Sequence, residues 1–184
     1  DFSTFEEFWG FLKKEDKKIM LTEQGSLQQI KGVSHASKNL EQGEVAERQA
    51  KAADVSLSQF KAPIHIRTEY NDALCSGSGI TVYAICSEEL EKNPVILGGD
   101  ALGEKGKMAE NIGREAANNL IKQIISDAAV DEHMADNLIP FLGLFGGEIK
   151  VADITAHTKT NIYTTEKFLG KIFKVDKAND MISA

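Results

Sequence analysis

The longest regular pattern in the chain is an apolar repeat over residues 107–126, and it limits the possible folds more than any other stretch. Apolar residues recur there every fourth position, widened by neighbours on the same face: Met108, Ile112, Ala116, Leu120 and Ile124, with Ala109, Ala117, Ile121 and Ile125. This period predicts an amphipathic helix that buries one face. A β-branched run at 80–86 suits a central strand, so we expect helix and sheet to pack in layers.

Shorter patterns complete this unit. Strand-like runs lie at 19–21, 27–33, 64–67 and 95–97, the last closed by Gly98-Gly99, and a helix with a small-residue face spans about 43–60. The resulting β-α-β-β-β-α order over 19–126 predicts an α/β or α+β unit. Glycines at 76–79 and at 98–106 could be a phosphate loop, but neither segment has the Walker lysine pattern or the dinucleotide spacing. Turns are therefore the preferred interpretation.

Charge and cysteine usage narrow the class of protein. A net charge of −7 argues against a sequence-independent nucleic-acid binder, whose affinity comes from neutralising phosphates. No apolar run approaches the ~18 residues of a membrane span. Cys75 and Cys86 have no zinc-like spacing, and we interpret them as reduced core thiols. These features predict a cytoplasmic protein without a membrane partner.

The N-terminal segment carries an unusual aromatic cluster: Phe2, Phe5, Phe8, Trp9 and Phe11. Spacings of three and four predict one apolar face of a helix, followed by a charged linker at 13–18. Two interpretations stay open. The face either packs on its own domain or binds another chain.

A second unit begins near Val130. We expect an apolar helical stripe made of Val130, Met134, Leu138, Phe141, Leu142 and Phe145. His133, Asp136 and Asn137 stand at i, i+3 and i+4, so they share a polar face that can converge on one ligand. Alternatively, these three residues are ordinary solvent-exposed polar groups in the first turns of a helix.

Pro140 lies inside this helix. Because proline has no N–H, the Asp136 carbonyl loses its intrahelical partner and we expect a kink. A proline in a helix interior costs on the order of 3 kcal/mol. This cost suggests a compensating use.

The remaining elements are a strand at 148–154, a helix at 158–169, a strand at 172–175 and a polar tail. His157 stands where the strand meets the helix. The partial positive charge of a helix start disfavours imidazolium, and a neutral ring is what a nucleophilic nitrogen requires. His157 is therefore a nucleophile or ligand, or else a structural residue satisfied by backbone near the cap.

Two motifs carry a resemblance to a known family. Val-Asp-Glu-His-Met-Ala-Asp-Asn-Leu-Ile-Pro at 130–140 and Ala-His-Thr-Lys-Thr-Asn-Ile-Tyr at 156–163 resemble the C-terminal signature of the RNA 3'-terminal phosphate cyclases. Weaker similarity extends over about 21–176. The resemblance implies a small thioredoxin-like α/β insert domain at 21–126 and, at 127–184, part of a catalytic domain built of βαβαββ repeats. Residues 1–20 are left unassigned.

The resemblance also implies an activity. Enzymes of this family, of the ligase class, use ATP and a divalent metal ion, Mg or Mn, to convert an RNA 3'-phosphate into a 2',3'-cyclic phosphate. By motif position His157 is the nucleophile that becomes histidyl-AMP. Asp136 is the acid near the triphosphate and the metal. His133 covers the adenine, and Asn137 contacts the nucleotide where glutamine is more usual.

The family's N-terminal half supplies arginines, an acidic metal residue and most of the ATP pocket, and no segment of this chain matches it. We therefore expect a C-terminal portion that is inactive alone. Its expected partners are an RNA 3'-phosphate end and either the missing N-terminal half or a second copy of the chain. The alternatives are a non-catalytic cyclase-like scaffold, which would lack the nucleophile, and an oligomerising binding module.

Overall fold

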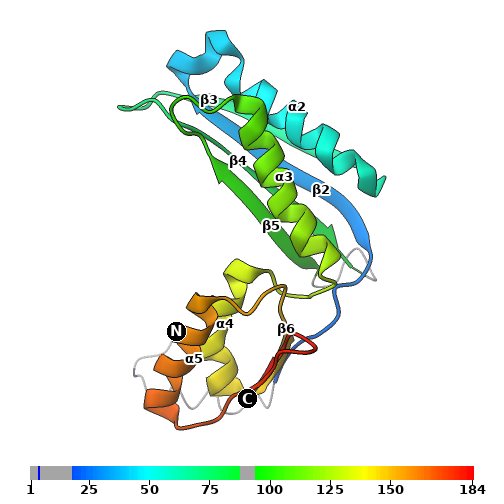
Figure 1. Cartoon of the computed structure of the whole chain (residues 1–184), viewed down its shortest axis with the longest axis vertical. Coiled ribbons are helices and arrows are strands. Elements are labelled where there is room, and N and C mark those ends of the chain that lie inside the picture. Colours follow the sequence, from blue (N-terminus) through cyan, green and yellow to red (C-terminus); the bar gives the residue numbers. More distant parts are fainter. Residues whose placement is uncertain (1–3, 5–17, 88–93) are drawn as a thin grey trace. The chain divides into compact units, whose positions relative to one another are not determined.

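The computed structural model describes residue 4 and residues 18–87 and 94–184, in two compact units. One unit is Glu23–Asp131, and the other combines residues up to Thr22 with Glu132–Ala184. Both have a mixed sheet and helices, which confirms the predicted α/β class (Figure 1). The aromatic helix predicted near the N-terminus lies outside the described residues.

The unit at 23–131 is a four-stranded sheet that carries two helices. Its strand order is β3-β2-β4-β5, with β2 and β3 parallel and the other pairs antiparallel. In chain order the elements are β2 (Leu27–Ser37), η1 (Lys38–Gly43), α2 (Val45–Leu57), η2 (Ser58–Phe60), β3 (Ile64–Asn71), β4 (Ser78–Cys86), β5 (Val95–Leu102) and α3 (Ala109–Ile125). From residue 27 onward this order confirms the predicted sequence of strands and helices, and β4 is a central strand as expected. The strand predicted at 19–21 for the same unit belongs to the other unit, where it pairs with β6 (Gly147–Lys150).

Helix α3 buries most of the face that its period predicts. Ile112, Ala116 and Leu120 are fully buried against the sheet. The prediction is wrong at the two ends, because Met108 precedes the first helical residue and Ile125 closes the last turn, and both are exposed.

Gly98 and Gly99 do not end β5, as predicted, but lie within it. The reason is steric. A Cβ on Gly99 would lie 2.8 Å from the Ala116 carbonyl oxygen and from Leu120 Cα, so α3 packs directly on the bare backbone of the strand. A Cβ on Gly98 would meet only the Asp131 carboxylate, at 3.6 Å.

The two cysteines have different environments. Cys86 is buried in the sheet, and burial raises the pKa of its thiol to about 11. Cys75 is exposed in the loop before β4, so the prediction of a core thiol is wrong for this residue. Both thiols are free.

Among its described residues, the second unit contains a four-stranded sheet of order β1-β6-β8-β7 and two helices. The strands are β1 (Ile19–Leu21), β6 (Gly147–Lys150), β7 (Lys174–Asp176) and β8 (Met181–Ser183), and the helices are α4 (Glu132–Phe145) and α5 (Ala156–Leu169). The tail, which was predicted to be polar, contains β8, an inner strand with Ile182 fully buried. Within the described residues we find no helix long and apolar enough to cross a membrane.

The buried stripe of α4 differs from the predicted one. Ala135, Ile139 and Leu142 are buried, whereas Met134 and Phe141 are about half exposed. The prediction started the period at Val130, but the helix begins at Glu132, and the buried face is rotated by about one residue.

The contrast between Gly98 and Gly99 predicts a position-specific effect on stability. Gly99→Ala should destabilise the unit by about 3 kcal/mol, because the new methyl group meets the backbone of α3 rather than a flexible side chain. Gly98→Ala is the matched control and should change stability little. Urea unfolding followed by far-UV circular dichroism measures both variants, and equal midpoints would contradict the close packing.

Candidate functional site

The first turns of α4 hold three of the predicted site residues together. The Asn137 side-chain amide donates to the His133 carbonyl oxygen, at 2.7 Å, and to Asp136 Oδ1, at 2.8 Å. Asp136 is partly buried, while His133 is largely exposed and its Nε2 lies 3.8 Å from Glu132 Oε1. Residues 133, 136 and 137 all lie in α4, where Asn137 bonds to the Asp136 carboxylate and to the main chain of His133.

Helix α4 runs unbroken through Pro140. The Asp136 carbonyl, which Pro140 deprives of its usual donor, accepts a hydrogen bond from Asn161 Nδ2 of α5 at 2.9 Å. A side chain of the neighbouring helix thus replaces the missing backbone N–H. Sequence reasoning located the acceptor but missed the donor.

His157 is the second residue of α5 and is exposed. The cap of this helix is Thr155, whose Oγ1 accepts from the Thr158 backbone N–H at 3.2 Å and lies 3.1 Å from Thr158 Oγ1. Since threonine hydroxyls perform the capping, the imidazole is not required for it.

Two contacts give the relative direction of α4 and α5, which lie side by side (Figure 1). Near their starts Asp136 pairs with Asn161, and further along a Cβ on Gly143 would lie 3.0 Å from Thr165 Cγ2 and 3.1 Å from Leu169 Cδ1. Both contacts advance toward the C-terminus together, so the helices are parallel. Their N-terminal turns, which carry His133 and His157, lie at the same end of the pair.

Two parallel helix starts are suited to an anion. The helix dipole gives each N-terminus a partial positive charge, which favours phosphate. For a metal ion the arrangement offers less, because in the described part of the chain no three acidic, histidine or cysteine residues gather as ligands. Asp136 alone would be a single carboxylate ligand.

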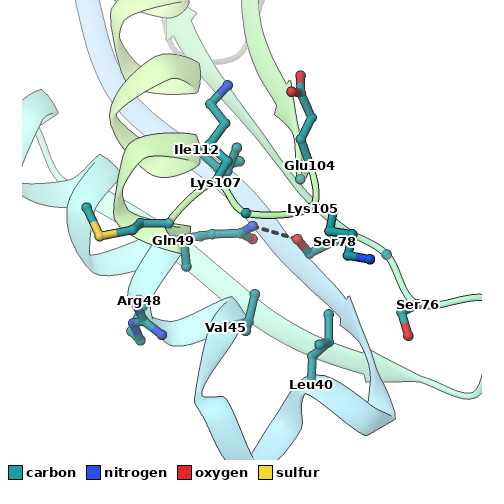
Figure 2. Close-up of a pocket in the computed structure, with 15 residues that line it drawn as sticks. Leu40, Val45, Arg48, Gln49, Ser76, Ser78, Glu104, Lys105, Lys107 and Ile112 are labelled. Atoms are coloured by element: carbon teal, nitrogen blue, oxygen red, sulfur yellow. Dashed lines mark hydrogen bonds between the residues drawn. The ribbon is translucent and has the colours of Figure 1, made fainter.

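The unit at 23–131 contains a separate cavity of about 510 Å³ beside Gln49 (Figure 2). The two glycine-rich segments that are distant in sequence both line it, through residues 76–78 and 103–107. Gln49 is fully buried, donates to Ser78 Oγ at 2.9 Å and accepts from Ser34 Oγ at 2.9 Å. Sequence reasoning did not bring these segments together, because only the sheet register places them side by side.

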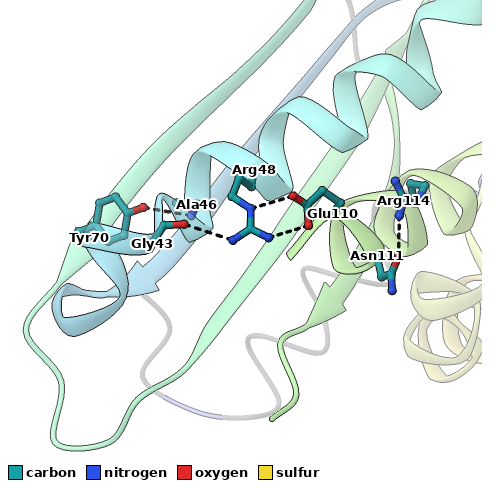
Figure 3. A network of polar contacts seen from close by, with 7 residues as sticks. All are labelled: Gly43, Ala46, Arg48, Tyr70, Glu110, Asn111 and Arg114. Atoms are coloured by element: carbon teal, nitrogen blue, oxygen red, sulfur yellow. Dashed lines mark hydrogen bonds and ion pairs between the residues drawn. The ribbon is translucent and has the colours of Figure 1, made fainter. Parts of the chain in front are cut away.

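Of the three cations that line this cavity, Arg48, Lys105 and Lys107, the first and the last are paired with carboxylates. Arg48 binds Glu110 through two hydrogen bonds of 2.7 and 2.9 Å and also donates to the Gly43 carbonyl oxygen at 3.3 Å (Figure 3). Lys107 pairs with Glu115. The geometry thus favours the turn interpretation of the glycines over a phosphate loop.

The same contact changes the acidity of Glu110. The hydrogen bonds from Arg48 lower the pKa of Glu110 to about 2. Tyr70 of β3 contacts the start of α2. Its hydroxyl donates to Glu47 Oε2 at 2.5 Å and accepts from the Ala46 backbone N–H at 3.1 Å. These bonds connect the start of α2 to α3 on one side and to β3 on the other.

The fold and these contacts define a mixed α/β protein of two units, one of which presents an exposed histidine at the start of one of two parallel helices. Comparison with known proteins gives the family. Residues 22–125 match the insert domain of RNA 3'-terminal phosphate cyclase (RTC). The chain belongs to the RNA 3'-terminal phosphate cyclase family.

Curated relatives agree over most of the chain. It is 47% identical to the RNA 3'-terminal phosphate cyclase of Pyrococcus abyssi over 163 residues, which are 89% of this chain and 45% of that protein. Identity to the Thermococcus onnurineus cyclase is 49%, over 89% of this chain and 46% of the relative. Identity to the Archaeoglobus fulgidus cyclase is 41%, over 80% of this chain and 42% of the relative. The chain thus spans about half the length of the curated relatives it matches.

The Arg48–Glu110 pair predicts how stability depends on pH. Because the pKa of Glu110 is lower in the folded state than in the unfolded chain, the pair stabilises the fold above about pH 4.3, the ordinary value for glutamate. This contribution is lost as the pH falls toward 2. Glu110→Gln should therefore melt below the wild type at pH 7, and the difference in Tm should shrink as the solution is acidified.

Thermal unfolding at a series of pH values measures this difference. Glu104→Gln, a substitution on the exposed loop before α3, is the matched control and should follow the wild type at every pH. A Tm difference for Glu110→Gln that stays constant down to pH 2 would contradict the assignment.

Proposed function

We propose that this chain contributes the nucleophile of an ATP-dependent RNA 3'-terminal phosphate cyclase, of the ligase class. The observation that carries the proposal is the position of His157, exposed at the start of α5 and at the same end of the helix pair as Asp136 and Asn137. Membership of the cyclase family supports the same reaction.

In the proposed reaction a ring nitrogen of His157 attacks the α-phosphorus of ATP. A P–N bond forms, the P–O bond to the leaving group breaks, and pyrophosphate departs, so that AMP is held on the histidine. The AMP then passes to the 3'-phosphate of the RNA. The neighbouring 2'-hydroxyl attacks that phosphorus, AMP leaves, and the 2',3'-cyclic phosphate remains.

The other residues would bind and orient the nucleotide. The exposed, planar His133 ring suits stacking on the adenine. Asn137 holds the Asp136 carboxylate by a hydrogen bond, which would fix its direction toward the triphosphate. A divalent metal ion, Mg or Mn, would neutralise phosphate charge when bound, with Asp136 as one of its ligands. The two helix N-termini would add partial positive charge near the phosphates.

The second half of the site is proposed to come from residues outside this chain. Charge that develops on the α-phosphate in the transition state needs fixed cationic donors. Near His157 and Asp136 the described residues offer helix ends rather than an arginine pair. We therefore expect the 184-residue chain by itself to be inactive and its cyclase activity to require the part that the relatives carry in addition.

The non-catalytic alternatives have less support. A cyclase-like scaffold has no need of an exposed histidine at a helix start. The oligomerising module depends on the aromatic segment near the N-terminus, which lies outside the described residues except Thr4.

The proposal predicts that His157→Ala abolishes covalent labelling by α-labelled ATP in the native full-length protein, because the substitution removes the attacking nitrogen. The loss should exceed 10³-fold, as expected when a nucleophile is removed. Gel autoradiography of the denatured protein, with mass spectrometry of the labelled peptide, gives the measurement.

His65→Ala is the matched control, since His65 is another exposed histidine but lies on β3 of the other unit. It should keep full labelling. Labelling that persists in His157→Ala would contradict the proposed mechanism. Labelling of the isolated 184-residue chain would contradict the proposal that activity requires the part that the relatives carry in addition.

A further inference from the structure

The hydrogen bond between α5 and the Asp136 carbonyl has a cause in the sequence of α4. A helical carbonyl normally accepts from the N–H four residues later, and here that residue is Pro140, which has none. A buried carbonyl oxygen without a hydrogen-bond donor destabilises the fold, so a donor from another element is favoured here. Asn161 supplies it from the facing side of α5, where the side chain is half-buried.

This bond connects the two halves of the candidate site. Asn161 is four residues after His157 and therefore lies on the same face of α5, one turn further along. Its acceptor belongs to Asp136, whose side chain is held by Asn137. The bond thus sets the height and rotation of the His157 turn relative to the Asp136 carboxylate.

The second close approach between the helices, at Gly143, is apolar. A Cβ on Gly143 would lie 3.0 Å from Thr165 Cγ2 and 3.1 Å from Leu169 Cδ1. Apolar contacts of this kind allow small shifts along the helix axes, whereas a hydrogen bond to one carbonyl oxygen is directional. The amide of Asn161 is thus the contact that specifies register at the end where the histidines lie.

We propose that Asn161 is a positioning residue for nucleotidyl transfer, held by its hydrogen bond to the Asp136 carbonyl, which Pro140 leaves without a backbone donor. This inference rests on the proposed function of His157. Asn161 touches no reacting atom. It keeps the attacking nitrogen of His157 in line with the phosphate that the Asp136 side of the site holds.

The test separates positioning from simple satisfaction of the carbonyl. Three variants of the native full-length protein are compared: Asn161→Leu, Pro140→Ala, and the two combined. Asn161→Leu removes the donor at similar volume. Pro140→Ala returns a backbone N–H to the Asp136 carbonyl, so the combined variant has a satisfied carbonyl without the link between the helices.

For each variant we would measure Tm, the Kd for ATP and the single-turnover rate of label transfer from saturating α-labelled ATP. Asn161→Leu should lower Tm and slow transfer by about 100-fold, the effect of a misplacement near 1 Å, while the Kd for ATP changes little. The combined variant should recover the Tm but not the rate. Pro140→Ala alone should keep both, because Asn161 can still donate.

The combined variant decides the question even where Asn161→Leu does not fold. A wild-type rate in the combined variant would overturn the inference, since the amide would then serve only the carbonyl. A combined variant that cannot fold would also overturn it, because the restored N–H should suffice for stability. If His157→Ala loses its label while the combined variant transfers at full rate, the proposed function stands and only the role of Asn161 falls.

Discussion

The placement of the candidate site depends on one backbone carbonyl, that of Asp136. Peptide groups buried in a fold must find partners, and proline at position 140 removes the local one. The Asn161 amide takes its place and thereby ties a residue near the start of α5 to one near the start of α4. Two histidines that are 24 positions apart, His133 and His157, lie at the end of the parallel helix pair where this bond is made.

The two units bring their helices close by different means. In the unit at 23–131 the elements approach closely where a glycine has no side chain. Gly99 lets α3 lie on β5, and a Cβ on Gly113 would overlap the Gln49 backbone of α2. Such packing is rigid and apolar, with polar bonds such as Arg48–Glu110 at its edge. The other unit combines a close approach at Gly143 with a directional side-chain bond between α4 and α5. A directional bond can fix a catalytic register, which bare apolar packing does less well.

A feature of the fold can be predicted from the sequence when its pattern lies within one short segment of the chain. The face of α3 has a strong period over 17 residues, so its core positions were predictable, apart from the residues at its ends. The buried stripe of α4 was predicted at the wrong positions because many residues in and next to that helix in the sequence are apolar. Its period therefore had no clear first residue. Strand β8 is three residues long and has no period to detect, yet it becomes an inner strand through pairing with β6 and β7. The pairing of β1 with β6 likewise joins segments far apart in sequence, for which one sequence holds no signal.

The candidate site has the same division between local and long-range information. The spacing of His133, Asp136 and Asn137 is a property of one helix and appears as expected. Pro140 identified an acceptor without a partner, but any donor on any element could have filled it, and only the tertiary structure selects Asn161. This selection explains why a motif around His157 should extend four residues beyond the proposed nucleophile. In the proposed reaction His157 would provide the chemistry, and Asn161, one turn later, would set the register of α5 against α4.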